Sequence, residues 1–199
     1  MPTTKKITCY TFAELSEEAK TRVRDRYREN YPDYDWWDWT YDRAKEVGSL
    51  IGIDIDDISF SGFWSQGDGA SFTGKYSYEK GSKQAIRAEA PTDTGLHNIA
   101  DRLAEVQHKH FYKLTATITR PAGRYYHENS VDIDVEIDGD PYRNIRRSAE
   151  NAIQECLREF MRWIYKRLEA EYDYLTSDEK IDQCLSEGDT EYEANGEEV

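Results

Sequence analysis

The sequence predicts an α+β fold: a mostly antiparallel sheet of about four or five strands, helices on one face and a long C-terminal helix. Three observations predict it. Two strand–turn–strand segments with glycine in the turn indicate hairpins, whose strands pair antiparallel. Helical apolar spacing surrounds these segments without the strict strand–helix alternation of a parallel fold. A long amphipathic stretch follows the second segment.

The first fifty residues predict one strand and two helices. Residues 5–10 contain Ile, Thr and Tyr, which are typical of a strand. Ser16 precedes two glutamates and predicts the start of a helix that runs to about Asn30 and stops at Pro32. Apolar residues at steps of three and four predict a second helix from about Asp35 to Ile51.

The middle of the chain contains the two predicted hairpins. Residues 53–64 and 70–78 have strand character and flank a turn at 65–69. A short helix over 83–88 and a longer one over 94–108 follow. Residues 111–120 and 125–137 are predicted as two further strands, joined by a Pro-Ala-Gly turn at 121–123.

The C-terminal third predicts two helices and a tail. Asp140 followed by Pro141 is a strong helix start, and the helix should run to about Leu175. Its predicted buried stripe is Ile145, Ala149, Ile153, Cys156, Phe160, Trp163 and Leu168. Thr176 with Glu179 fits a capping box for a short helix to about residue 186. Residues 187–199 hold six acids and no Lys or Arg, so we expect one domain over 1–186 and a disordered acidic tail.

Charge and composition narrow the functional classes. Lys and Arg total 26 against 40 Asp and Glu, a net charge of −14, which argues against direct binding to a nucleic-acid backbone. An acidic surface suits a basic partner, although a merely well-solvated surface has the same composition. Three cysteines, without C-x-x-C spacing, favour a reducing compartment. With no signal peptide at the N-terminus and no run long enough to span a membrane, we expect a cytoplasmic protein with no membrane partner.

Alternating acids mark the last predicted strand. Five acids alternate with four aliphatic residues and should share one face: Asp132, Asp134, Glu136, Asp138 and Asp140. The pattern resembles the start of a calcium loop, but Ile145 stands where that loop needs its final Glu. A wet strand face, a surface for a basic partner and a Mg²⁺ or Mn²⁺ cluster remain open. We predict no metal and no cofactor.

The glycine-bearing segment 60–72 is the main candidate binding site. It holds three glycines and four aromatic residues but lacks the P-loop lysine and the Gly-x-Ser-x-Gly of a nucleophile elbow. It is either a structural hairpin with its rings in the core or a recognition hairpin. In the second case the binding residues are Phe63, Trp64, Ser65, Gln66 and Asp68. Two further candidates, Trp36 and Trp39, belong to a tryptophan cluster that either packs in the core or forms a binding hot spot.

Familiar catalytic arrangements are missing from the sequence. On a helix the two histidines of the His108-x-His110 pair would lie about 200° apart, too far around to share a metal ion, and no His-Glu-x-x-His occurs. His127 and Glu128 could act as a general acid and base, but no nucleophile accompanies them. We therefore predict no catalytic residues and a protein that is not an enzyme.

Several stretches resemble a family of small phage and prophage proteins labelled "antitoxin of toxin–antitoxin stability system". They are residues 10–16 (YTFAELS), 33–37 (DYDWW), 60–69 (FSGFWSQGDG), 160–165 (FMRWIY) and 174–179 (YLTSDE). The resemblance extends over roughly residues 7–185. It implies a bacterial or phage setting and a neutralising protein, and it carries no catalytic or binding residues.

Three functions follow as hypotheses. The first is an antitoxin-like or anti-defence inhibitor that neutralises a bacterial toxin or host effector by binding it. The second is a small-ligand binder, such as a sponge for a nucleotide signal, with its pocket beside Phe63, Trp64 and Gln66. The third, a metal-dependent enzyme using the strand acids, is the weakest. The sequence leaves the oligomeric state open.

Overall fold

The computed structural model describes residues 6–30, 35–123, 125–139 and 145–199. Where the sequence predicts one domain, the chain divides into two compact units. The first, here the sheet unit, comprises Trp37–Glu169, and the second, here the small unit, comprises Met1–Trp36 with Ala170–Val199. The division falls within the longest helix, which contributes residues to both units.

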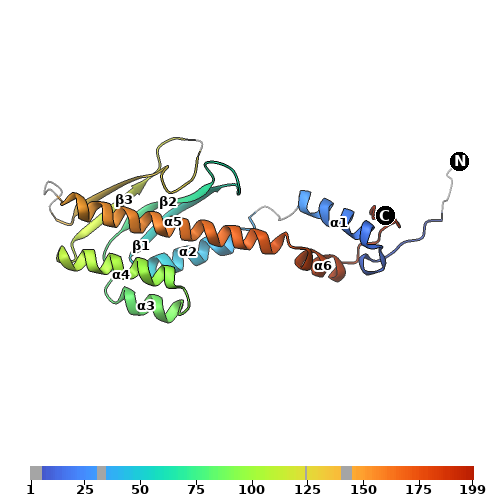
Figure 1. Cartoon of the computed structure of the whole chain (residues 1–199), viewed down its shortest axis with the longest axis horizontal. Coiled ribbons are helices and arrows are strands. Elements are labelled where there is room, and N and C mark those ends of the chain that lie inside the picture. Colours follow the sequence, from blue (N-terminus) through green and yellow to red (C-terminus); the bar gives the residue numbers. More distant parts are fainter. Residues whose placement is uncertain (1–5, 31–34, 124, 140–144) are drawn as a thin grey trace. The chain divides into compact units, whose positions relative to one another are not determined.

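The sheet unit has the predicted α+β architecture. Its four strands form one antiparallel sheet in the order β1-β2-β3-β4. The elements wholly within it are α2 (Asp38–Leu50), β1 (Ile53–Ser61), β2 (Gly69–Tyr76), α3 (Ser82–Glu89), α4 (Thr94–Lys109), β3 (Leu114–Thr119) and β4 (Asp132–Ile137). α5 (Arg147–Leu175) is the long C-terminal helix (Figure 1). Three antiparallel strand pairs, with helices before, between and after them, confirm the predicted fold class.

A bulge in β1 keeps its isoleucines on the buried face. The pairing with β2 shifts between Ile55 and Asp57, so Asp56 is the extra residue. Ile53, Ile55 and Ile58 are all buried although their spacing changes from two to three. The bulge absorbs that change, because one inserted residue restores the side-chain alternation.

The helices pack on one face of the sheet. Phe160 of α5 lies edge-on to Phe72 of β2 with ring centroids 6.0 Å apart, and α5 also reaches β4, where Gln154 Nε2 donates to the Ile133 carbonyl at 2.9 Å. Gln107 of α4 is fully buried and bonds both backbone groups of Leu114, at 3.1 and 2.6 Å. These contacts place the core between one face of the sheet and the helices α4 and α5. The buried amide of Gln107 is hydrogen-bonded there, as buried polar groups generally are.

The opposite face of β4 is exposed and acidic. Asp132, Asp134 and Glu136 are exposed, while Ile133 and Val135 are buried. This alternation confirms the predicted separation of acids from aliphatics for the described residues. Asp138 is also exposed, and Asp140 lies outside the described residues.

The small unit is built from η1 (Phe12–Glu14), α1 (Glu17–Asn30), α6 (Asp178–Glu187) and the C-terminal segment. Its core is a cluster of five buried residues: Phe12, Leu15, Ala19, Val23 and Tyr192. Arg24 joins α1 to α6 by a bidentate bond to Asp182, with N···O distances of 2.6 and 2.7 Å. The predicted boundaries of α1 agree with the structure, and Pro32 lies outside the described residues.

Two predictions for the chain ends differ from the structure. A strand is predicted over residues 5–10, but within the described residues 6–10 only Tyr10 pairs, in an isolated bridge with Tyr192. Lys5 lies outside the described residues. The acidic segment 187–199, predicted to be disordered, carries that Tyr192, which is 1% exposed. Tyr192 also bridges to Glu198. One buried aromatic ring and these backbone bonds order a segment whose average composition predicts disorder.

Other boundaries differ because the turns differ. The connection between β3 and β4 spans residues 120–131 rather than a three-residue turn. α5 begins at Arg147, and the predicted start at Asp140 and Pro141 lies outside the described residues. Ser177, not Thr176, caps α6, and its side chain accepts the Lys180 amide. Within the described ranges, no helix is both long and apolar enough to cross a bilayer.

Candidate functional site

The connection between β1 and β2 forms a compact loop, here the Trp64 loop (residues 62–68). The Asp68 carboxylate accepts the Ser65 amide at 2.6 Å, and the Asp68 amide donates to the Ser65 carbonyl at 3.1 Å. Ser61 Oγ adds a bond to the Gly67 carbonyl at 3.4 Å. These short-range bonds fix the loop backbone, as Asp and Ser side chains commonly do in turns.

Aromatic rings from β1, α5 and the start of α2 pack against the Trp64 loop through Phe63 and Phe60. Phe63 stacks on Phe60 of β1 at 5.7 Å and lies 5.5 Å from Tyr165 of α5. Phe60 in turn meets Trp37 at 5.4 Å in an edge-on arrangement. Aromatic pairs at these distances add stability beyond the area they bury. Phe63 is therefore the anchor of the loop rather than its most exposed part.

Tyr165 links the loop to α5. Its hydroxyl donates to the Gly62 carbonyl at 3.4 Å. Burial raises the pKa of Tyr165, and the negative charge of Asp68 raises it further. The phenol thus stays protonated as a donor to the loop, because both effects disfavour the phenolate.

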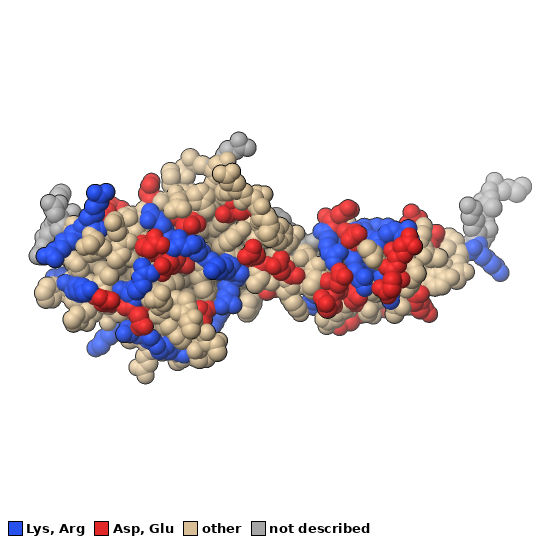
Figure 2. Space-filling view, in the orientation of Figure 1, with Lys and Arg blue, Asp and Glu red and all other residues tan. Residues whose placement is uncertain are grey.

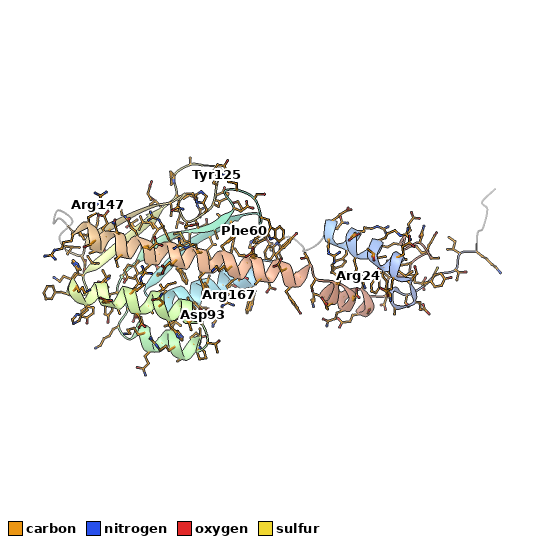
Figure 3. The ribbon with its side chains drawn as sticks, viewed as in Figure 1. Arg24, Phe60, Asp93, Tyr125, Arg147 and Arg167 are labelled. Atoms are coloured by element: carbon orange, nitrogen blue, oxygen red, sulfur yellow. The ribbon has the colours of Figure 1, made fainter. Side chains whose placement is uncertain are left out.

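The β3–β4 connection packs against the loop. A Cβ atom added at Gly69 would lie 2.5 Å from the Cβ of His127, and one added at Gly67 would lie 3.1 Å from the ring of Tyr125. These two glycines therefore permit close approach between the connections, which explains their presence in the hairpin. Figure 3 marks Tyr125 on the β3–β4 connection and Phe60 on β1.

Arg120 holds the base of the β3–β4 connection. Its guanidinium donates to Asp57 Oδ2 and to Ser59 Oγ, both at 3.0 Å, and to the Ser71 carbonyl at 3.2 Å. The same group lies 5.2 Å from the centroid of the Tyr126 ring. Three acceptors and one ring fix this arginine, which in turn contacts the β3–β4 connection at Tyr126.

The loop presents its tryptophan to solvent. Trp64 is 71% exposed and adopts a φ of 69°, a left-handed conformation that is rare for a bulky residue. Tyr125 is 59% exposed, and Ser65 and Gln66 are exposed as well. The structure thus keeps two large rings and a polar turn at one surface, at a cost of about 1–3 kcal/mol in backbone strain at Trp64.

The structure separates the candidate residues of the sequence analysis. Phe63, Trp64, Ser65, Gln66 and Asp68 share the loop, but Asp68 has a structural role. Trp39 is 70% exposed on α2, and a helix turns roughly 200° between Trp37 and Trp39, so Trp39 points away from the aromatic support of the loop. Trp36 belongs to the small unit, where it lies 5.6 Å from Tyr172.

Three residues that contact the Trp64 loop or its base cannot be identified from the sequence: Tyr125, His127 and Tyr165. Each comes from an element far from residue 64 in sequence, and only the pairing of β1-β2-β3 and the packing of α5 bring them to the loop. The only signals in the sequence are the small residues Gly67 and Gly69, which mark a close approach but not its partner.

The residues considered as catalytic groups or metal ligands do not come together in one site within the described part of the chain. His127 Nδ1 accepts the Asn129 amide at 3.1 Å, and Glu128 pairs with Arg162 at 3.4 Å. Among the residues that the structure describes, no three His, Cys, Asp or Glu side chains are grouped so as to hold a metal ion. Burial raises the pKa of the Cys156 thiol to about 12, so that cysteine is no nucleophile at neutral pH.

Fold and site together define a small α+β protein with an aromatic loop braced on its sheet. Residues 36–178 match the DUF8835 family, a domain of unknown function, and the chain belongs to this family. The match includes the whole sheet unit and ends at the start of α6. No curated protein and no solved structure matches the chain.

Proposed function

We propose that this chain is a non-enzymatic binding protein and that the Trp64 loop, together with Tyr125, holds a protein partner. The observation that carries the proposal is the 71% exposed Trp64 ring on a backbone fixed by Asp68, Ser61 and Tyr165. Trp and Tyr are the residues most enriched at binding hot spots. A preorganised loop also loses little conformational entropy when a partner binds.

The partner we propose is a bacterial toxin or a host defence effector, neutralised in the cytoplasm of a bacterium by a phage- or prophage-encoded protein. The resemblance at residues 60–69 and 160–165 supports this, because both stretches belong to the loop and its support. A net charge of −14 favours a basic partner and disfavours direct contact with nucleic acid.

The contacts of each loop residue decide which substitutions test binding without disturbing the fold. Trp64→Ala is a suitable probe because the ring is 71% exposed, although it lies 5.7 Å from the Phe63 ring. We expect the substitution to lower the free energy of unfolding by about 0.5–1.5 kcal/mol. Asp68→Ala is a poor probe, since it removes the acceptor of the Ser65 amide. Gln66→Ala is the second probe, as its side chain is exposed.

Co-expression with a panel of bacterial toxins and defence effectors tests the proposal, with growth rescue as the readout. Any rescue should be lost in the Trp64→Ala, Gln66→Ala double variant. Trp39→Ala removes an equally exposed ring that points away from the loop support, and it should rescue fully. Full rescue by the folded double variant would refute the proposed surface.

A further inference from the structure

A second concave site lies far from the Trp64 loop in sequence, where α4 ends and α5 begins. It is a pocket of about 590 Å³, within the range of roughly 300–1,000 Å³ typical of small-molecule sites. Its walls are Val106, Lys109, His110, Phe111, Lys113, Ile137, Ile145, Arg146, Ser148, Ala149 and Ala152. All of these residues belong to the described part of the sheet unit.

The charge of this pocket is opposite to that of the protein. Among the described residues, its wall has three Lys or Arg side chains and one His but no Asp or Glu, although acids outnumber bases 40 to 26 in the chain. Lys109 pairs with Glu105 at 2.6 Å. Lys113 and Arg146 form no ion pair with any described residue, so they are available to an anion. Figure 2 shows blue side chains prominent at the end of the unit where α5 starts.

The helix ends reinforce this positive character. α5 presents its N-terminal end at Ser148, and its macrodipole favours an anion there. The Ala149 and Glu150 amides already donate to the Arg146 carbonyl at 2.8 and 3.2 Å, so an anion would use the amides that precede them. The last turn of α4 also lies at the pocket, and the free carbonyls at the C-terminal end of a helix ordinarily repel an anion. Here the Gln107 carbonyl accepts the His110 and Tyr112 amides at 3.0 and 2.8 Å, so the structure satisfies that acceptor internally.

The turn after α4 holds an aromatic ring at the pocket wall. Phe111 and Tyr112 both have positive φ, 55° and 61°, which non-glycine residues adopt only when the surroundings impose it. Tyr112 is fixed by the ring of Tyr78 at 4.4 Å. Phe111, its neighbour, is 83% exposed. The strained turn therefore keeps an apolar ring beside the cations instead of burying it.

From this geometry we infer that the pocket binds a small organic phosphate. The phosphate group would lie at Lys113, Arg146 and the start of α5. The ring or other apolar part of the ligand would lie against Phe111, Val106 and Ile137. Cations at a helix N-terminus suit a phosphate, because charge-assisted hydrogen bonds and the dipole act together. The apolar wall explains why an organic phosphate should bind better than inorganic phosphate. This site is independent of the Trp64 loop.

Calorimetric titration of the full chain tests the inference with 5′-AMP, phenyl phosphate, inorganic phosphate and adenosine. We expect saturable one-to-one binding of the two organic phosphates, weaker binding of inorganic phosphate and no binding of adenosine. The Lys113→Gln, Arg146→Gln variant should weaken binding about tenfold or more. Phe111→Ala should weaken the organic phosphates while leaving inorganic phosphate unchanged.

The matched control is Lys75→Gln, Lys166→Gln, which removes the same charge from two exposed lysines of the same unit that are not in the pocket wall. It should leave the affinities unchanged. An equal loss in this control, adenosine binding as tightly as 5′-AMP, or no saturable binding at millimolar probe would overturn the inference. Amide chemical shifts should move at Val106, Phe111 and Ser148, and shifts confined to residues 62–68 would also overturn it.

Discussion

Asp93 shows how a single carboxylate joins two helices of the sheet unit. Its Oδ1 accepts the Leu96 amide at 3.1 Å and caps α4, while Oδ2 accepts Trp163 Nε1 at 2.8 Å and Arg167 Nη2 at 2.6 Å from α5. Figure 3 marks Asp93 and Arg167. The Asp93 side chain is only 14% exposed, whereas Arg167 is half exposed, so solvent screens the ion pair more than the other two bonds.

The same bonds make the stability of the protein depend on pH. Burial works to raise the pKa of Asp93, but the hydrogen bonds from Trp163, Leu96 and Arg167 outweigh it and hold the pKa below the ordinary value. A carboxyl with a lowered folded pKa stabilises the fold above its unfolded pKa of about 3.9. That stabilisation is lost as the pH falls through the folded pKa.

Asp93→Asn should therefore lower the free energy of unfolding by about 2 kcal/mol at neutral pH, since it removes charged acceptors while keeping a residue that can cap α4. The difference from the parent protein should shrink as the pH falls below about 4. Urea unfolding at a series of pH values measures it. Asp132→Asn, an exposed acid on β4, is the control and should have little effect; a pH-independent deficit in Asp93→Asn would contradict the argument.

Single residues also mark the limit of sequence reasoning at the candidate site. Trp64 and Gln66 could be chosen from the sequence because a glycine-bearing turn is exposed whatever it contacts. The role of Asp68 could not, since whether it faces a ligand or the Ser65 amide depends on the turn geometry. Tyr125 could not either, because its place beside Gly67 requires the pairing of β2 with β3.

Among the elements, β4 has a regular side-chain pattern that permits a clear prediction about metal binding. Its acids lie along one strand, so neighbouring carboxylates on the exposed face are about 7 Å apart along the backbone. The residues opposite them on β3 are Thr115, Thr117 and Thr119. A divalent cation needs several oxygen ligands within about 2.6 Å, and one row of carboxylates facing threonines does not supply them.

Calorimetric titration with Mg²⁺, Mn²⁺ and Ca²⁺ should accordingly show no stoichiometric site of micromolar affinity on β4. Weak, salt-sensitive heats are expected, because exposed carboxylates attract cations without coordinating them closely. Asp134→Asn should leave those heats nearly unchanged. A tight site that disappears in Asp134→Asn would refute this prediction and would also reopen the enzyme hypothesis.

Helices with a regular apolar period are predictable from the sequence. α1 and α4 agree with their predicted ranges to within a residue or two, and α5 ends at the predicted Leu175. The short α3 also agrees, although its eight residues are too few to show a long period. The second hairpin was predicted as two strands, but its connection is longer than a Pro-Ala-Gly turn. Residues 125–130 have strand-like composition, yet they contact the Trp64 loop instead of extending β4.

At the scale of the whole molecule, the chain consists of two units with separate cores. The core of the small unit depends on residues from both ends of the chain, because Tyr192 packs with Phe12, Leu15, Ala19 and Val23. Backbone bonds of 2.8 and 2.9 Å join Tyr10 to Tyr192 in both directions. Composition could not predict this arrangement, since a single tyrosine among acids changes the average of the segment very little.

Tyr192→Ala should therefore destabilise the small unit and leave the sheet unit folded. Removing a fully buried ring costs about 3–5 kcal/mol, which is large for so few core residues. Hydrogen exchange should show lost protection in α1 and α6, with unchanged protection in β2, β3 and α4. Tyr174→Ala, which removes a 55% exposed ring from the same unit, is the matched control and should keep protection. Unchanged exchange in α1 would show that the C-terminal segment contributes nothing to the core, whereas lost protection throughout both units would show that they fold as one.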